Sequence, residues 1–96
     1  MSSPLVYITG ASSGIGQALA QRFAQQGWRL ALVARRSAEL QAWVDAQGLE
    51  AERVRVYGAD VRDVRSIVDA GRSCLASQGL PDAVVANAGI SVGMDT

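Results

Sequence analysis

The sequence predicts an α/β fold in which a doubly wound parallel sheet is covered by helices on both faces. Three observations predict it. Four short apolar runs alternate with three segments of helical periodicity, a glycine-rich turn follows the first run, and that first run is apolar throughout. A continuous apolar run is typical of a strand that is covered on both faces of its sheet. With 96 residues the chain forms one domain at most.

The first predicted strand covers residues 5–9, and the first predicted helix covers roughly residues 14–26. Pro4 stands just before the strand, where its missing amide is tolerated. Gly27 follows the last helical turn and is placed to cap it. Apolar side chains recur in this helix at helical spacing, at Ile15, Ala18, Leu19, Phe23 and Ala24.

The second strand is predicted over residues 29–34 and is followed by a second helix. Ser37 offers a hydroxyl that would cap this helix, and Glu39 lies in its first turn, where the helix dipole favours an acid. The helix is expected to end near Gly48. A strand, a helix and a return strand in this order are the unit from which parallel sheets are built.

Residues 53–57 alternate polar and apolar side chains, which predicts a third strand at the edge of the sheet. Asp63 is placed to cap a third helix, which Gly79-Leu80-Pro81 ends. Residues 82–86 predict a fourth, buried strand. We expect the third helix to pack through a single apolar stripe formed by Val64, Ile67, Val68, Gly71 and Leu75.

Right-handed crossovers determine how these strands are ordered. The first three strands step outward in one direction and the fourth returns beside the first, so the predicted order is 3-2-1-4. The first two helices then cover one face and the third helix the other. The topological switch falls between the first and fourth strands, which is where such sheets bind ligands. Residues 10–16 and 87–90, which are rich in glycine and small side chains, would meet there.

The turn after the first strand carries glycines with the spacing Gly-x-x-x-Gly-x-Gly, at Gly10, Gly14 and Gly16. A glycine-rich turn between a buried strand and a helix lets the backbone approach a phosphate closely. It also directs unpaired helix N-terminal amides at the negative charge. The segment therefore predicts a site for a dinucleotide pyrophosphate. An ordinary tight turn is the alternative.

Thr9-Gly10-Ala11-Ser12-Ser13-Gly14-Ile15-Gly16, Asp60-Val61 and Asn87-Ala88-Gly89-Ile90 together closely resemble the short-chain dehydrogenase/reductase family. The resemblance spans the whole chain and implies the N-terminal part of a single Rossmann-type NAD(P)-binding domain. It also implies roles for individual residues. Gly10 would allow the tight turn, Gly14 and Gly16 would allow close approach of the pyrophosphate and packing of the first helix, and ribose or phosphate contacts would come from Ser12, Ser13 and the Ile15 amide.

The same resemblance implies that Asp60 bonds the adenine amino group, with Val61 beside the ring. Asn87, Ala88 and Gly89 would line the far side of the cofactor. Other interpretations stay open for two of these residues. Asp60 could be a turn residue at a strand end, and Asn87 could form an Asx-type turn.

Charge at the end of the second strand favours NADP over NAD. An NAD site places an acid about 20 residues beyond the glycine motif, where it binds the ribose 2′-hydroxyl. Here that place holds Arg35 and Arg36. Two guanidinium groups near the positive end of a helix dipole are unfavourable unless an anion is present, and a 2′-phosphate would supply one. The alternative is a solvated arginine pair.

No catalytic residue can be assigned in these 96 residues. The family transfers hydride using a Tyr-x-x-x-Lys site and a Ser, but the sequence contains neither lysine nor histidine, and both tyrosines, Tyr7 and Tyr57, lie inside predicted strands. The absence of histidine also argues against most zinc sites. We expect the N-terminal, cofactor-binding part of an NADP-dependent oxidoreductase of the carbonyl reductase or alcohol dehydrogenase type. A catalytically inactive nucleotide-binding module or sensor is the alternative.

Composition limits the partners that we expect. Nine basic residues, all arginine, balance nine acidic ones, so no basic field points to nucleic acid. No apolar stretch approaches the ~20 residues of a membrane span. A single cysteine and the lack of a secretory signal favour the cytoplasm. Family analogy implies a small-molecule carbonyl or alcohol substrate and a homodimer or homotetramer.

Overall fold

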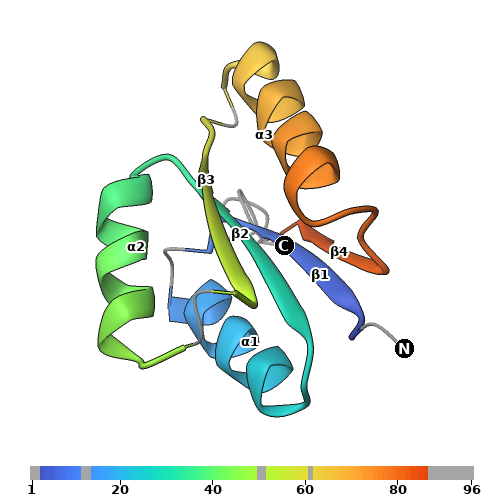
Figure 1. The fold of residues 1–96 in the computed structure, drawn as a ribbon. Coiled ribbons are helices and arrows are strands. Elements are labelled where there is room, and N and C mark those ends of the chain that lie inside the picture. Colours follow the sequence, from blue (N-terminus) through green and yellow to red (C-terminus); the bar gives the residue numbers. More distant parts are fainter. Residues whose placement is uncertain (1–2, 12–13, 50–51, 61, 87–96) are drawn as a thin grey trace, which may run out of the picture.

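The computed structural model describes residues 3–11, 14–49, 52–60 and 62–86, in which strands and helices alternate (Figure 1). The elements are β1 (Leu5–Thr9), α1 (Gly14–Gln25), β2 (Arg29–Ala34), α2 (Ser37–Ala46), β3 (Val54–Gly58), α3 (Val64–Ser77) and β4 (Ala83–Ala86). Every predicted strand and helix is present, and β3 and β4 each begin one residue later than predicted.

The four described strands form one parallel sheet in the order β3-β2-β1-β4, as predicted (Figure 1). The register aligns the strand ends. Thr9, the last residue of β1, lies opposite Val33 of β2 and Ala86 of β4. Ala34, the last residue of β2, lies opposite Gly58 of β3. The residues that follow β1, β2 and β3 therefore lie together at the carboxyl ends of the strands.

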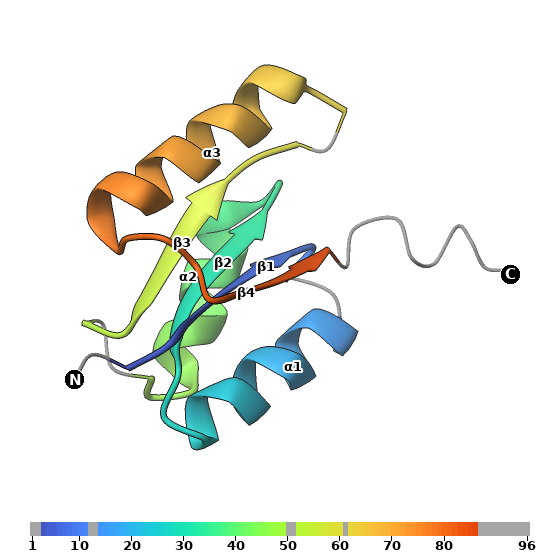
Figure 2. The same cartoon turned by 90° about the vertical axis from the view of Figure 1, so that its right-hand side faces the viewer.

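Helices cover both faces of the sheet, with α1 and α2 on one face and α3 on the other (Figure 2). On the first face, Ala20 of α1 and Leu40 and Val44 of α2 pack on buried side chains of β1 and β2. On the second face, Cys74 of α3 packs on Leu5 and Ala31. This arrangement confirms the predicted doubly wound, Rossmann-type fold.

Helix ends agree with the prediction at three places and disagree at one. Gly27 and Gly48 have positive φ angles of 87° and 70° after α1 and α2. Asp63 caps α3 by accepting a hydrogen bond from the Arg65 amide at 3.0 Å. The predicted Ser37 cap is wrong, because α2 begins one residue earlier. Arg36 is the N-cap without a side-chain cap bond, and the Ser37 hydroxyl lies against the end of β3.

The predicted packing stripe of α3 is also wrong. The side chains that α3 buries are small, Ala70 and Cys74, whereas Val64, Val68 and Leu75 are exposed by 71%, 44% and 52%. Small side chains let a helix approach a sheet closely, and this turns the bulkier apolar stripe toward solvent. Apolar periodicity identified the helix correctly but not the face that it buries.

Strand β4 is less covered than predicted. Val84 is 65% exposed, Ala86 is exposed, and Ala83 and Val85 are half-buried. Within the described residues β4 pairs with β1 alone. Helix α3 contacts β3, which forms the opposite edge of the sheet from β4 (Figure 2). An apolar run such as Val84-Val85 therefore marks a strand here without marking a fully buried one.

Candidate functional site

A cavity of about 550 Å³ opens where β1, β2 and β3 end. The end of β1, the segment that joins β2 to α2 and the segment that joins β3 to α3 all contribute to it. Its lining residues are Tyr7, Thr9, Gly10, Val33, Ala34, Arg35, Arg36, Glu39, Ala59, Asp60, Arg62 and Ile67. The cavity lies at the carboxyl ends of parallel strands, which is where sheets of this topology bind ligands.

The glycine turn places α1 directly against the end of β1. Gly10 has a φ of 63°, in the left-handed region that favours glycine. A Cβ atom on Gly16 would lie 2.5 Å from the Gly10 carbonyl oxygen and 2.8 Å from the Ala11 Cα atom. The turn is held to the sheet because the Ala11 amide donates to the Val33 carbonyl at 3.0 Å. The backbone thus excludes a side chain at position 16 and favours glycine at position 10.

The N-terminus of α1 is suited to an anion. Its first turn carries no acidic side chain, and no described residue comes within 4 Å of the Cβ position at Gly14. Ile15 is 62% exposed. The first amides of a helix lack intrahelical partners and carry the positive end of the helix dipole. Among the described residues, no side chain therefore blocks the approach of a phosphate to the Gly14 backbone.

Arg35 and Arg36 follow β2, are exposed, and both line the cavity. Arg36 pairs with Glu39 of α2, with 3.5 Å between Nη1 and Oε2. Arg35 forms no ion pair with any residue that the structure describes. The end of β2 therefore presents Arg36 in an ion pair and Arg35 outside one, although the Arg35 charge also helps to lower the Asp60 pKa.

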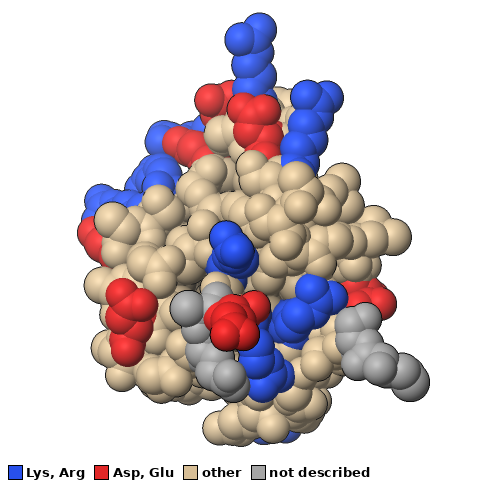
Figure 3. Space-filling model, in the orientation of Figure 1, with Lys and Arg blue, Asp and Glu red and all other residues tan. Residues whose placement is uncertain are grey.

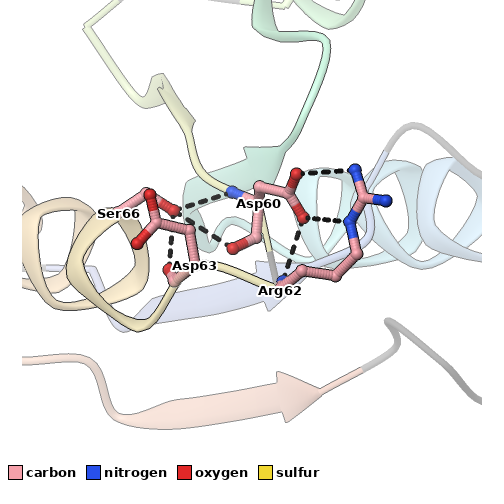
Figure 4. A network of polar contacts seen from close by, with 4 residues as sticks. All are labelled: Asp60, Arg62, Asp63 and Ser66. Carbon is pink, nitrogen blue, oxygen red and sulfur yellow. Dashed lines mark hydrogen bonds and ion pairs between the residues drawn. The ribbon is translucent and has the colours of Figure 1, made fainter.

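Asp60 follows β3, and its carboxylate is held by Arg62 (Figure 4). Oδ1 accepts from the Arg62 amide at 2.9 Å and from Nε at 3.2 Å, and Oδ2 accepts from Nη2 at 3.0 Å. The side-chain hydrogen bonds from Arg62, followed by the one from its backbone, lower the Asp60 pKa to about 2. Ser66 of α3 fixes the backbone of Asp60, because its hydroxyl accepts from the Asp60 amide at 2.9 Å.

The structure brings four of the predicted site residues together. Gly10, Arg35, Arg36 and Asp60 line one cavity. Three others, Gly14, Ile15 and Gly16, lie at the start of α1, directly after the turn. The remaining six lie outside the described residues, namely Ser12, Ser13, Val61, Asn87, Ala88 and Gly89.

Sequence reasoning missed several lining residues, of which Arg62 and Glu39 carry charge. The signal for Arg62 was available, since an Asp followed two residues later by an Arg can form an Asx-type turn that is closed by an ion pair.

Figure 3 shows acidic and basic side chains side by side around the start of α3, at the top of the view. Charges of both signs therefore lie together at this end of the molecule.

Neither of the two tyrosines has the lowered pKa of a catalytic phenol. Burial raises the pKa of both Tyr7 and Tyr57, which is opposite to what a catalytic phenol needs. The Tyr57 hydroxyl donates to Gln78 Oε1 at 2.8 Å.

Among the described residues, no group of three His, Cys, Asp or Glu side chains could hold a metal ion. None of the described helices is long and apolar enough to cross a membrane.

A parallel sheet in the order β3-β2-β1-β4, a glycine turn against a helix N-terminus and a cavity at the strand ends define a Rossmann-type domain. Comparison with known families narrows this class. The family model described as short chain dehydrogenase matches residues 4–96, and the chain belongs to this family of oxidoreductases. Members of the family bind nicotinamide cofactors and act on small molecules.

Similar proteins support this assignment. Sulfoacetaldehyde reductase 2 of Chromohalobacter salexigens is 46% identical over 70% of this chain and 27% of its own length. An NADP-dependent 3-hydroxy acid dehydrogenase of Shigella flexneri is 33% identical over 95% of this chain and 36% of its own length. The chain thus spans about a third or less of these relatives.

A solved structure is similar as well. The 3-ketoacyl-(acyl-carrier-protein) reductase of Brucella melitensis, complexed with NADH, matches with a TM-score of 0.74 and 27% identity. The match covers 84% of this chain and 32% of the reductase.

Proposed function

We propose that this chain binds NADP within an oxidoreductase that transfers hydride between the nicotinamide and a carbonyl or hydroxyl group of a small molecule. Arg35 carries the proposal, because it lines the cavity at the end of β2 and forms no ion pair with a described residue. An NADP-dependent relative supports this choice of cofactor. Another relative was solved with NADH, so the experiment has to compare the two cofactors directly.

The described residues fit such a cofactor. Gly10 and Gly16 keep the turn and α1 in contact, and the open space at Gly14 admits a phosphate to the helix amides. The proposal assigns Ser12, Ser13 and the Ile15 amide to the ribose and phosphates. Asp60 and Val61 are assigned to the adenine, and Asn87, Ala88 and Gly89 to the far side. When bound, the nicotinamide supplies the hydride chemistry.

A 2′-phosphate is the anion that the charges near β2 favour. Arginine binds phosphate through two parallel hydrogen bonds and stays charged at all physiological pH values. Arg36 can join Arg35, because its pair with Glu39 is exposed, and an exposed pair is worth only about 0–1 kcal/mol. NAD offers a neutral hydroxyl at the same place, which gives Arg35 no phosphate to bind.

The test is the selectivity of binding, measured by calorimetric titration of the intact protein with NADPH and with NADH. We expect Arg35→Asp with Arg36→Leu to weaken NADPH binding far more than NADH binding. Arg65→Asp with Arg72→Leu is the matched control, since both residues are exposed arginines of α3 that do not line the cavity. Equal losses for the two cofactors would overturn the assignment of NADP.

The proposal also covers the substrate, the location and the assembly of the whole enzyme. By analogy with the family, we assign it a small-molecule carbonyl or alcohol substrate and assembly as a homodimer or homotetramer. The single cysteine favours a cytoplasmic location. Size-exclusion chromatography with light scattering tests the assembly, and it is independent of the choice of cofactor.

A further inference from the structure

The Asp60 carboxylate is bonded to Arg62 in a way that leaves a defined acceptor site. Oδ1 receives two hydrogen bonds, from the amide and from Nε of Arg62, whereas Oδ2 receives one, from Nη2 (Figure 4). Each carboxylate oxygen can accept two. Oδ1 is therefore filled by Arg62, and Oδ2 keeps one site for a further donor. Because both residues line the cavity, a bound ligand can supply that donor.

The backbone and the side chain of Asp60 are fixed by separate partners. Ser66 of α3 bonds the Asp60 amide at 2.9 Å, which holds the main chain at the end of β3. Among the described residues, Arg62 supplies every hydrogen bond to the carboxylate, and Arg35 acts on it through charge. The planar guanidinium grips both oxygens at once, which sets the rotation of the carboxylate as well as its position. The Arg62 side chain is 73% exposed and that of Asp60 only 29%.

We propose that Arg62 is a positioning residue that holds Asp60 as a pure acceptor with one open site, and that this makes the cavity selective for a 6-amino purine over a 6-oxo purine. The inference rests on the proposed function, in which Asp60 faces the base. An exocyclic amino group donates to the open site on Oδ2. A 6-oxo group brings a second acceptor against a carboxylate that has no proton to donate, and like partners repel.

Two other roles for Arg62 make different predictions. If Arg62 acted only as a positive charge near the phosphates, its loss would weaken all dinucleotides equally. If it blocked Asp60, its loss would strengthen binding of the adenine form. A positioning role predicts neither result, because only the discrimination between the two bases depends on the orientation of the carboxylate. The ratio of two affinities is therefore the informative measurement.

The experiment compares NADP with its hypoxanthine analogue, in which a 6-oxo group replaces the 6-amino group, by calorimetric titration of the full chain. We expect the unchanged chain to bind NADP about tenfold more tightly than the analogue, the value of one well-placed hydrogen bond to a charged group. In Arg62→Leu the ratio falls to about one. Arg62→Lys restores part of it, since an ammonium still pairs with one oxygen but does not grip both.

Arg65→Leu is the matched control. It removes the same charge from a residue that is three positions further along the chain and does not line the cavity. Its ratio should equal that of the unchanged chain. A ratio near tenfold in Arg62→Leu, or a gain in NADP affinity, would overturn the positioning role. Far-UV circular dichroism checks that each variant folds, and Arg62→Lys keeps the test decisive if Arg62→Leu does not fold.

A second measurement needs no ligand and separates this inference from the proposed function. Carbon-13 NMR of the aspartate carboxyls follows the Asp60 pKa, which is about 2 in the unchanged chain. Arg62→Leu removes the two side-chain bonds, which are the largest cause of the shift, so the Asp60 pKa should rise toward 3.8, the ordinary value, while the backbone bond from residue 62 and the nearby Arg35 charge keep it below that value. An unchanged pKa in Arg62→Leu would overturn the pairing itself. Failure of the unchanged chain to bind either dinucleotide would instead overturn the proposed function and, with it, the base-selecting role.

Discussion

Gly16 of α1 and Gly10 of the preceding turn approach so closely that a Cβ atom on Gly16 would lie 2.5 Å from the Gly10 carbonyl oxygen. Real side chains do not tolerate this distance to a backbone atom, so α1 can occupy its place only with glycine at position 16. The contact determines how near the helix N-terminus comes to the end of β1. The same contact therefore serves both the packing of the domain and the proposed phosphate site.

Gly16→Ala should destabilise the fold and weaken dinucleotide binding together. The added methyl group forces α1 away from the turn, and overpacking of this kind costs about 1–3 kcal/mol. Urea denaturation measures the free energy of unfolding, and calorimetry measures NADPH binding. A variant as stable as the unchanged chain would contradict the close contact.

Gly14→Ala is the matched control, because nothing described lies within 4 Å of its Cβ position. We expect no loss of stability, since alanine is a better helix former than glycine by about 1 kcal/mol. If a phosphate approaches the backbone there, as proposed, binding of NADPH should still fall. The two glycines thus separate a packing role from a ligand-contact role, and equal behaviour of the two variants would argue against that division.

Loss of the α3 cap should cost more stability than loss of the Ser37 hydroxyl. Asp63 accepts from the Arg65 amide at 3.0 Å, whereas α2 has no side-chain cap. Asp63→Ala should therefore destabilise the protein by about 1 kcal/mol. Ser37→Ala should change stability by less than about 0.5 kcal/mol. Urea denaturation of both variants checks the difference, and the opposite order would restore Ser37 as the cap.

The Asp60 and Arg62 pair should make stability depend on pH in the acidic range. Hydrogen bonds from Arg62 lower the Asp60 pKa from 3.8 to about 2, so between these values the unfolded chain binds more protons than the folded one. The stabilisation is complete above pH 3.8 and is lost as pH falls toward 2. Urea midpoints between these limits should fall less steeply in Asp60→Asn. An equally steep fall in that variant would assign the effect to other carboxylates.

Most of the fold could be predicted because its determinants are local. Apolar runs such as residues 5–9 and helical periodicity in residues 14–26 identify the elements, and crossover handedness then orders the strands. The face that α3 buries could not be predicted in this way. The small size of Ala70 and Cys74 determines it, and a search for bulky apolar stripes passes over small residues. The prediction of a Ser37 cap was wrong for a similar reason. Its hydroxyl lies against Gly58 at the end of β3, which is far away in the sequence.

The candidate site was predictable in its positions and less so in its interactions. Gly10, Arg35, Arg36 and Asp60 follow strands, and parallel pairing brings strand ends together. The partners of their charges depend on rotamers and turn geometry, which the spacing of residues does not specify. Arg62 was missed because it belongs to neither the glycine motif nor the arginine pair. Its role emerges only from the distances to Asp60.

Removal of the Glu39 charge should strengthen NADPH binding. Glu39 lies in the first turn of α2, lines the cavity and holds Arg36 at 3.5 Å. A 2′-phosphate must compete with this carboxylate for Arg36, so Glu39→Gln should raise NADPH affinity about twofold to fivefold, the value of an exposed ion pair. NADH affinity should change less. Asp45→Asn removes the same charge from the other end of α2, outside the cavity, and should leave the ratio of the two affinities unchanged. An equal gain for both cofactors in Glu39→Gln would mean that a general reduction of negative charge, and not the release of Arg36, accounts for the effect.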